Sequence, residues 1–208
     1  MSETAKNRNN PFENDKIKYV TKIAVLSAIA MLISKLEIPL WFAPGFYKLD
    51  FSVVFVLLGG FALGPLAAIS VTVMKNLLKL LFFGTQTNYL GELADVVMLV
   101  LFSVTAALIY KRRKSIKGAV AGMAAGVAVM TAGACAFNYF ILIPAFAKLF
   151  FGGDIDAIIG MGTALNSRIT GLRSLIVYAT APFNLFKGIV CSLVTFLLYK
   201  RVSKILHL

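Results

Sequence analysis

The sequence predicts an all-α integral membrane protein with six transmembrane helices. Of its 208 residues, 59% are hydrophobic and 14% are charged, and the mean hydropathy is +0.84. Soluble domains contain only about 45–50% apolar residues. At about 20 residues per span, the chain can hold six helices and little else. We therefore expect one transmembrane domain over residues 1–208, in which 1–17 form a polar cytoplasmic segment.

Six apolar runs are the candidate spans. The first is short, and it reaches across a bilayer only if Lys22 and Lys35 extend their ammonium groups to the headgroups at its two ends. The second begins at Asp50 or Ser52, either of which is a plausible N-cap. The expected helices cover 23–34, 52–58, 65–83, 91–110, 118–144 and 181–199, and a structured external loop covers 148–174.

Glycine and proline residues mark the expected helix ends. Gly59-Gly60 and Gly64-Pro65 interrupt the apolar stretch that follows the second run, so we expect a tight turn there, with Pro65 opening the third helix. Pro182 likewise suits the first position of the last helix, because its missing N–H would be unpaired at that place anyway.

The basic residues indicate the orientation. Lys and Arg number 21 against 9 Asp and Glu, and they gather as five in 6–22, five in 111–117 and three in 200–204. With six spans these segments share one side, and an excess of Lys and Arg marks the cytoplasmic side. We expect a multi-pass protein of the cell membrane with both termini in the cytoplasm. Because the charge follows topology, it does not indicate a nucleic-acid partner.

Polar residues gather at the opposite, outer ends of the expected helices. Asn184 and Lys187 lie three apart on one helical face, and an ammonium in hydrocarbon usually faces a cavity or a partner. The alternative is that Lys187 reaches the nearer headgroups and Asn184 caps the helix. The residues that converge on this expected outward-facing pocket are Lys48, Asp50, Asn88, Glu92, Asn138, Asn184 and Lys187.

The third and fourth helices carry charges that call for partners. Lys75 and Lys79 are one turn apart and repel each other, so a carboxylate nearby is expected. Lys79 and Asp95 lie at similar depths on antiparallel helices, which predicts a structural pair between them. Glu92 would then be free for a ligand. The alternative for Glu92 is that it only stabilises the start of its helix.

The chain lacks the motifs of the common catalytic centres. It has no GxxxxGK[ST] phosphate loop, no HExxH and no GxSxG. Cys135 and Cys191 lie in apolar runs without a base beside them, and the one histidine, His207, is the penultimate residue. The sequence therefore predicts neither an enzyme nor a metal site, and no residue is assigned a catalytic role.

Five short stretches carry a family resemblance. They are KLDFS at 48–52, Gly64-Pro65, GELAD at 91–95, NYF at 138–140 with Pro144, and PFNLFKG at 182–188. Together they resemble the substrate-binding S component of energy-coupling-factor (ECF) vitamin transporters. The first three stretches resemble the superfamily at large, and the last two resemble its riboflavin-specific branch. The similarity runs from the first expected helix to the sixth.

The resemblance implies a function and partners. It implies a six-helix bundle that captures riboflavin with high affinity outside and delivers it inward with a transmembrane coupling protein and two ATPases. Riboflavin is then the transported ligand, and no cofactor is expected. Ala24 and Ala28 stand four apart, a spacing that suits close helix packing or an ordinary Ala-rich helix. In the family such residues on the first helix dock on the coupling protein.

The chemistry of the flavin fits the candidate residues. A carboxamide offers a donor and an acceptor, so Asn138 or Asn184 can pair with the polar edge of the isoalloxazine ring. Lys187 can donate to a ring carbonyl or N1. Acceptors for the ribityl hydroxyls would be Glu92 or Asp50, and Tyr139 and Phe183 are among the rings that could cover the flavin. Two alternatives stay open: the same scaffold for another vitamin such as thiamine, or a stand-alone membrane facilitator.

Overall fold

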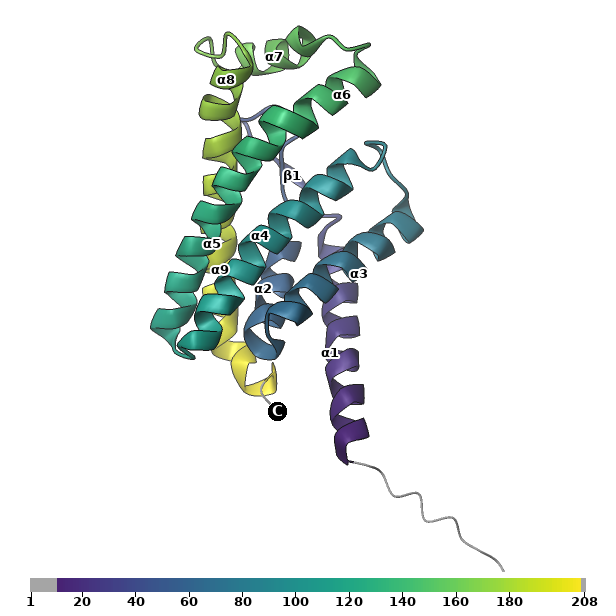
Figure 1. Ribbon diagram of the computed structural model, residues 1–208, viewed down its shortest axis with the longest axis vertical. Coiled ribbons are helices and arrows are strands. Elements are labelled where there is room, and N and C mark those ends of the chain that lie inside the picture. The colour runs from purple at the N-terminus through teal and green to yellow at the C-terminus, as the bar shows by residue number, and fades with distance from the viewer. Residues whose placement is uncertain (1–10, 207–208) are drawn as a thin grey trace, which may run out of the picture.

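The computed structural model describes the backbone of residues 11–206 and the side chains of 15–199, and within that range the protein is a bundle of helices with one two-stranded hairpin (Figure 1). Its helices are α1 Pro11–Ile33, α2 Ser52–Leu63, α3 Pro65–Phe83, α4 Leu90–Arg112, α5 Ile116–Phe137, α6 Ile143–Phe150, α7 Ile155–Thr163, α8 Leu172–Leu175 and α9 Ala181–Leu206. The strands β1 Ile38–Pro39 and β2 Lys48–Leu49 pair antiparallel in the loop between α1 and α2.

Four helical segments of the described range are long and apolar enough to cross a membrane. They are Pro65–Phe83, Leu90–Arg112, Ile116–Phe150 and Leu172–Tyr199. The expected all-α membrane class is thus confirmed. The first two expected spans are not among the four, since α2 has only 12 residues and α1 carries charged residues in its first half.

Two expected helix ends in the first half are wrong. α1 begins at Pro11, so the polar residues before Ile23 are already helical, while residues 1–10 of the expected 1–17 segment lie outside the described range. α2 continues through Gly59 and Gly60 to Leu63. A Cβ on Gly60 would lie 3.2 Å from the Cβ atoms of Ala107 and Ala68, so this glycine allows close packing and does not end the helix. The break at Gly64, where φ is 99°, is as expected.

The last two spans each contain a π-helical turn followed by a proline. The segments η1 Asn138–Leu142 and η2 Ile176–Thr180 precede Pro144 and Pro182, and in both the proline stands six residues after the first π residue. Proline removes one N–H and its ring clashes with the carbonyl four residues earlier, and a wider π turn relieves both problems. α8, η2 and α9 follow one another without a break and form one helical span from Leu172 to Tyr199. The prediction that Pro182 opens the last helix is therefore wrong.

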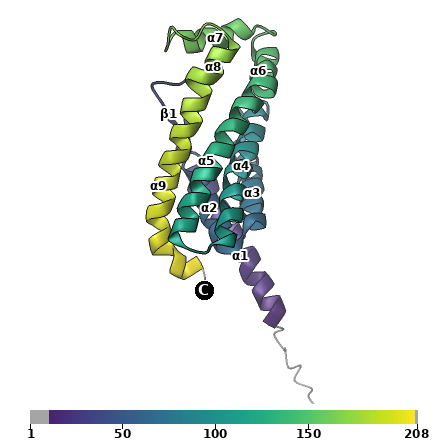
Figure 2. The ribbon, with the colours of Figure 1, turned by 60° about the vertical axis from the view of Figure 1, so that its left-hand side comes forward.

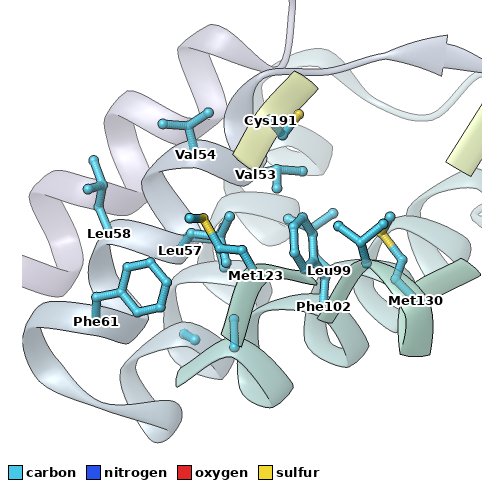
Figure 3. Close-up of a cluster of buried hydrophobic side chains, with 14 of the residues drawn as sticks. Val53, Val54, Leu57, Leu58, Phe61, Leu99, Phe102, Met123, Met130 and Cys191 are labelled. Carbon is cyan, nitrogen blue, oxygen red and sulfur yellow. The ribbon is translucent and has the colours of Figure 1, made fainter. Parts of the chain in front are cut away.

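The bundle has two distinct ends. α1 begins and α9 ends at one of them, beside the loop between α4 and α5, and α7 lies across the other (Figures 1 and 2). We call them the basic end and the α7 end. Between them the core forms around α2, where Val53 and Leu57 pack with Phe102 and Met123 (Figure 3). α4 and α5 approach closely, since a Cβ on Gly122 would lie 2.6 Å from the carbonyl oxygen of Ala106.

Candidate ligand-binding site

Tyr47 joins the two π-helical segments at the α7 half of the bundle. Its hydroxyl donates to Oδ1 of Asn138 at 2.8 Å and lies 2.7 Å from Oγ1 of Thr180. Its ring stacks on Phe183, with centroids 5.0 Å apart. Tyr47 belongs to the loop between α1 and α2, and burial raises the pKa of its hydroxyl well above the usual value. The phenol therefore remains a hydrogen-bond donor throughout the physiological pH range.

The two predicted asparagines lie at these π segments and are both buried. Nδ2 of Asn138 donates to the carbonyl of Ala134 at 2.8 Å, so Tyr47 and Ala134 hold its carboxamide from both sides. Nδ2 of Asn184 donates to the carbonyl of Thr180 at 2.9 Å, inside a continuous helix, so Asn184 is not an N-cap. Among the described residues, Oδ1 of Asn184 has no hydrogen-bond partner. It is the amide oxygen available to a ligand.

Lys187 lies one turn beyond Asn184 and is half-buried. It makes no hydrogen bond or ion pair with any described side chain, although it is close enough to Asp95 and Cys191 for a Coulombic interaction. Its ammonium therefore still has donors to offer. Together Asn184 and Lys187 present an acceptor and a donor on one helical face, as the sequence spacing indicates.

A buried ion cluster links α2, α3 and α4. Nζ of Lys75 lies 2.7 Å from Oδ2 of Asp95, 2.8 Å from Oγ of Ser52 and 3.3 Å from Oδ2 of Asp50. Asp50 also accepts from the backbone N–H and the hydroxyl of Ser52. In this form of the protein Asp50 is thus occupied in holding the start of α2 to α3. Nδ2 of Asn76 adds a bond to Asp95 at 3.1 Å.

The expected pair between Lys79 and Asp95 is wrong. Nζ of Lys79 instead lies 2.8 Å from Oε1 of Glu37, and Lys48 lies 2.9 Å from the other oxygen of the same carboxylate. The α1–α2 loop brings Glu37 to Lys79, while Lys75, one turn deeper, faces Asp95. Burial would raise the pKa of Glu37, but the hydrogen bonds and charges of Lys79 and Lys48 outweigh it and lower the pKa below its usual value.

Asn88 lies in the turn between α3 and α4, and Glu92 lies in the first turn of α4. Oε2 of Glu92 accepts from the hydroxyls of Thr85 and Thr87, each at 3.0 Å, which fixes this turn. Asn88 is exposed, with a left-handed φ of 46°. The connection between α3 and α4 lies on the side of the bundle opposite α8 in Figure 1. The structure thus brings Asn138 and Phe183 together through Tyr47, and Asn184 lies one turn from Thr180, the other partner of that tyrosine. Glu92 instead bonds to Thr85 and Thr87, and Lys48 pairs with Glu37.

Tyr139 and the two alanines on α1 complete the set of predicted residues. Tyr139 is half-buried, packs edge-to-face on Phe140 and lies beside the guanidinium of Arg173. Ala24 and Ala28 are both exposed on α1, so their face is not used for packing within the bundle. Among the described residues no cluster of His, Cys, Asp or Glu could hold a metal ion.

Sequence reasoning missed two residues of the site, Tyr47 and Thr180. Tyrosine commonly favours the membrane interface, and nothing in the sequence around Tyr47 distinguishes a buried tyrosine from an interfacial one. Its position directly before the KLDFS stretch is the one signal that could have drawn attention to it. Thr180 carries no such signal, since its role depends on the π turn that contains it.

The family of the chain follows from comparison with known proteins. The model of the family described as "ECF transporter, substrate-specific component" matches residues 18–199. The chain belongs to this family. A solved structure of the S component of a bacterial ECF transporter superposes with a TM-score of 0.71 at 34% identity, covering 92% of this chain and 98% of that one. The S component is the substrate-binding part of a transporter and not an enzyme, in agreement with the sequence.

Named relatives of this S component are riboflavin transporters. It is 36% identical to the riboflavin transporter RibU of Staphylococcus aureus, over 91% of this chain and 92% of that protein. It is 29% identical to the riboflavin transporter FmnP of Bacillus subtilis, over 90% and 93% of the two chains. The matched regions include both π segments and the α1–α2 loop, because they extend over nearly the whole chain.

Proposed function

We propose that this S component is the high-affinity riboflavin-binding subunit of an ECF-type uptake transporter. It captures riboflavin outside the cell and delivers it inward with a transmembrane coupling protein and two ATPases. The observation that carries the proposal is the group of two buried asparagines and a buried aromatic ring at the π segments, in a chain 36% identical to a riboflavin transporter. The α7 end then faces the outside.

The chemistry of this group suits a flavin. Oδ1 of Asn184 can accept from the ring N–H, and Lys187 can donate to a ring carbonyl or N1. Phe183 and Tyr139 offer aromatic faces for the isoalloxazine. In this structure the Tyr47 hydroxyl donates a hydrogen bond to Oδ1 of Asn138. Riboflavin that donates its ring N–H to this oxygen must therefore displace the Tyr47 hydroxyl or share Oδ1 with it, since an amide oxygen has two lone pairs.

The topology that fits this role has six spans with both termini in the cytoplasm. α1 and α2 would add two spans to the four apolar ones, with α5–α6 and α8–α9 each counted once. The support is that the basic segment 111–117 lies at the same end of the bundle as the first half of α1, which carries Lys16, Lys18 and Lys22. The exposed pair Ala24 and Ala28 is the proposed contact with the coupling protein.

Purification in mild detergent followed by flavin titration tests the proposal. We expect a yellow preparation, or a colourless one whose intrinsic fluorescence is quenched by riboflavin at nanomolar concentration. Binding of thiamine without binding of riboflavin would show that this S component has a different vitamin as its ligand. Uptake of riboflavin by cells that lack the coupling protein and ATPases would instead identify a stand-alone facilitator.

A further inference from the structure

An apolar groove of about 480 Å³ runs along the outside of the bundle between α5 and α9, which lie side by side in Figure 2. Its one polar side chain, Ser192, donates to the carbonyl of Gly188 at 2.7 Å and so has no hydrogen left for a ligand. The groove therefore selects an apolar occupant. Its walls are Val120, Met123, Ala124, Val127, Leu185, Ile189, Ser192, Leu193 and Phe196.

The length of the groove matches one leaflet of a bilayer. From Leu185 to Phe196 the α9 wall covers eleven helical steps, or about 16 Å at 1.5 Å per residue. The hydrocarbon core of a bilayer is about 30 Å thick, so this is roughly half of it. A single acyl chain that enters from one headgroup layer spans the same depth.

The groove lies near the basic end of the bundle, since its α5 wall runs from Val120 to Val127 and α5 begins at Ile116. Lys117 precedes Val120 by three residues and Ala124 by seven, so it lies on the same face of α5 as the groove. Lys117, Arg113 and Lys114 are exposed, and none of them pairs with a carboxylate among the described side chains. The stretch that contains these residues, 96–153, has no Asp or Glu of its own.

We propose that the α5–α9 groove binds one acyl chain of an anionic phospholipid, whose phosphate lies on the basic residues of 113–117. Basic pockets between transmembrane helices on the cytoplasmic side are suited to anionic headgroups. The unpaired positive charge of these residues selects an anionic headgroup, and the uncharged walls of the groove hold the acyl chain. This surface is separate from the riboflavin site at the π segments and does not depend on the ligand bound there.

Native mass spectrometry of the detergent-solubilised protein tests the site. Phosphatidylglycerol and phosphatidylcholine with identical acyl chains are titrated separately, and we expect tighter binding of phosphatidylglycerol. Lys117→Gln should weaken the binding of phosphatidylglycerol about fivefold, which corresponds to about 1 kcal/mol per basic residue. The affinity for phosphatidylcholine should not change. Lys148→Gln, at an exposed lysine in the last turn of α6, is the matched control and should change the binding of neither lipid.

Filling the groove distinguishes it from the rest of the lipid-facing surface. Ala124→Trp should remove the preference for phosphatidylglycerol, whereas Ala121→Trp, which is also exposed on α5 but outside the groove, should keep it. Equal binding of the two lipids by the wild type, or an unchanged preference for phosphatidylglycerol in Ala124→Trp, overturns the proposal. A dimer that Ala124→Trp disrupts would assign the groove to a second copy of the chain instead. Riboflavin affinity, measured on the same samples, tests the other site independently.

Discussion

Nζ of Lys75 lies 2.7 Å from Oδ2 of Asp95, and this contact joins α3 to α4 inside the bundle. Lys75 is completely buried and also lies 3.3 Å from Asp50. Lys75→Met would leave two carboxylates without their common cation, and removing one partner of a buried pair costs roughly 3–5 kcal/mol. We expect a large fall in the thermal unfolding midpoint in detergent, and a partial recovery when Asp95→Asn is added.

Lys79→Met is the matched control for Lys75, one turn away on the same helix. Lys79 and its partner Glu37 are both partly exposed, and such a pair contributes about 0–1 kcal/mol. The unfolding midpoint should therefore change little. If both methionine variants unfold at the same temperature, the buried cluster does not stabilise the fold as the geometry indicates.

Lys187→Met should weaken riboflavin binding without unfolding the protein. A hydrogen bond from a charged donor contributes about 1.5–3 kcal/mol, and Lys187 makes none within the described part of the chain. The dissociation constant from fluorescence quenching measures the loss. Lys48→Met, which removes an exposed lysine paired with Glu37, should bind like the wild type. Wild-type affinity in Lys187→Met would mean that this ammonium faces the headgroups only.

Tyr47→Phe should reduce stability by leaving Oδ1 of Asn138 unpaired. The phenol hydroxyl is that oxygen's hydrogen-bond donor, and a buried acceptor without a partner costs about 1–3 kcal/mol. Calorimetry or a thermal-shift assay gives the change in unfolding temperature. Tyr89→Phe, at an exposed tyrosine, is the control and should be neutral. No change in Tyr47→Phe would show that the hydroxyl does not hold the two π segments together.

Acidification should loosen the α1–α2 loop through Glu37. Its pKa in the folded protein is lowered by Lys79 and Lys48, so the carboxylate binds its proton less readily than in the unfolded chain. The stabilisation of the folded state by the Glu37 carboxylate is therefore complete above the usual pKa of 4.5. It is lost as the pH falls from there through the lower pKa of the folded protein. Unfolding temperature against pH should show a steeper acid decline in the wild type than in Glu37→Gln. Parallel curves would contradict this role.

Ala24→Trp or Ala28→Trp should separate uptake from binding. Both alanines are exposed on α1, so a large side chain there leaves the bundle intact but blocks close approach of another helix. We expect nearly unchanged riboflavin affinity in detergent and loss of uptake in cells that contain the coupling protein and ATPases. Val25→Trp, exposed on a different side of α1, should transport normally. Loss of affinity in Ala28→Trp would mean that this face packs within the protein.

The sequence by itself determined the class of the protein and several helix boundaries. Apolar runs predict spans because the bilayer core requires them, and the third helix, Pro65–Phe83, agrees with the structure at both ends. Gly64-Pro65 marks a true break because its cause is local, a positive φ followed by a proline at the first helical position. The amide and lysine of the PFNLFKG stretch share a helical face for the same local reason.

Only the tertiary structure decided which polar groups meet. Lys75 and Lys79 are equivalent by spacing, yet one binds Asp95 and the other Glu37, because each depth along α3 faces a different neighbour. Tyr47 is buried because the α1–α2 loop folds over two helices whose contact residues, Asn138 and Thr180, follow 91 and 133 residues later. Hydropathy and turn chemistry act over a few residues, whereas an ion pair or a bridging hydroxyl depends on how whole helices pack.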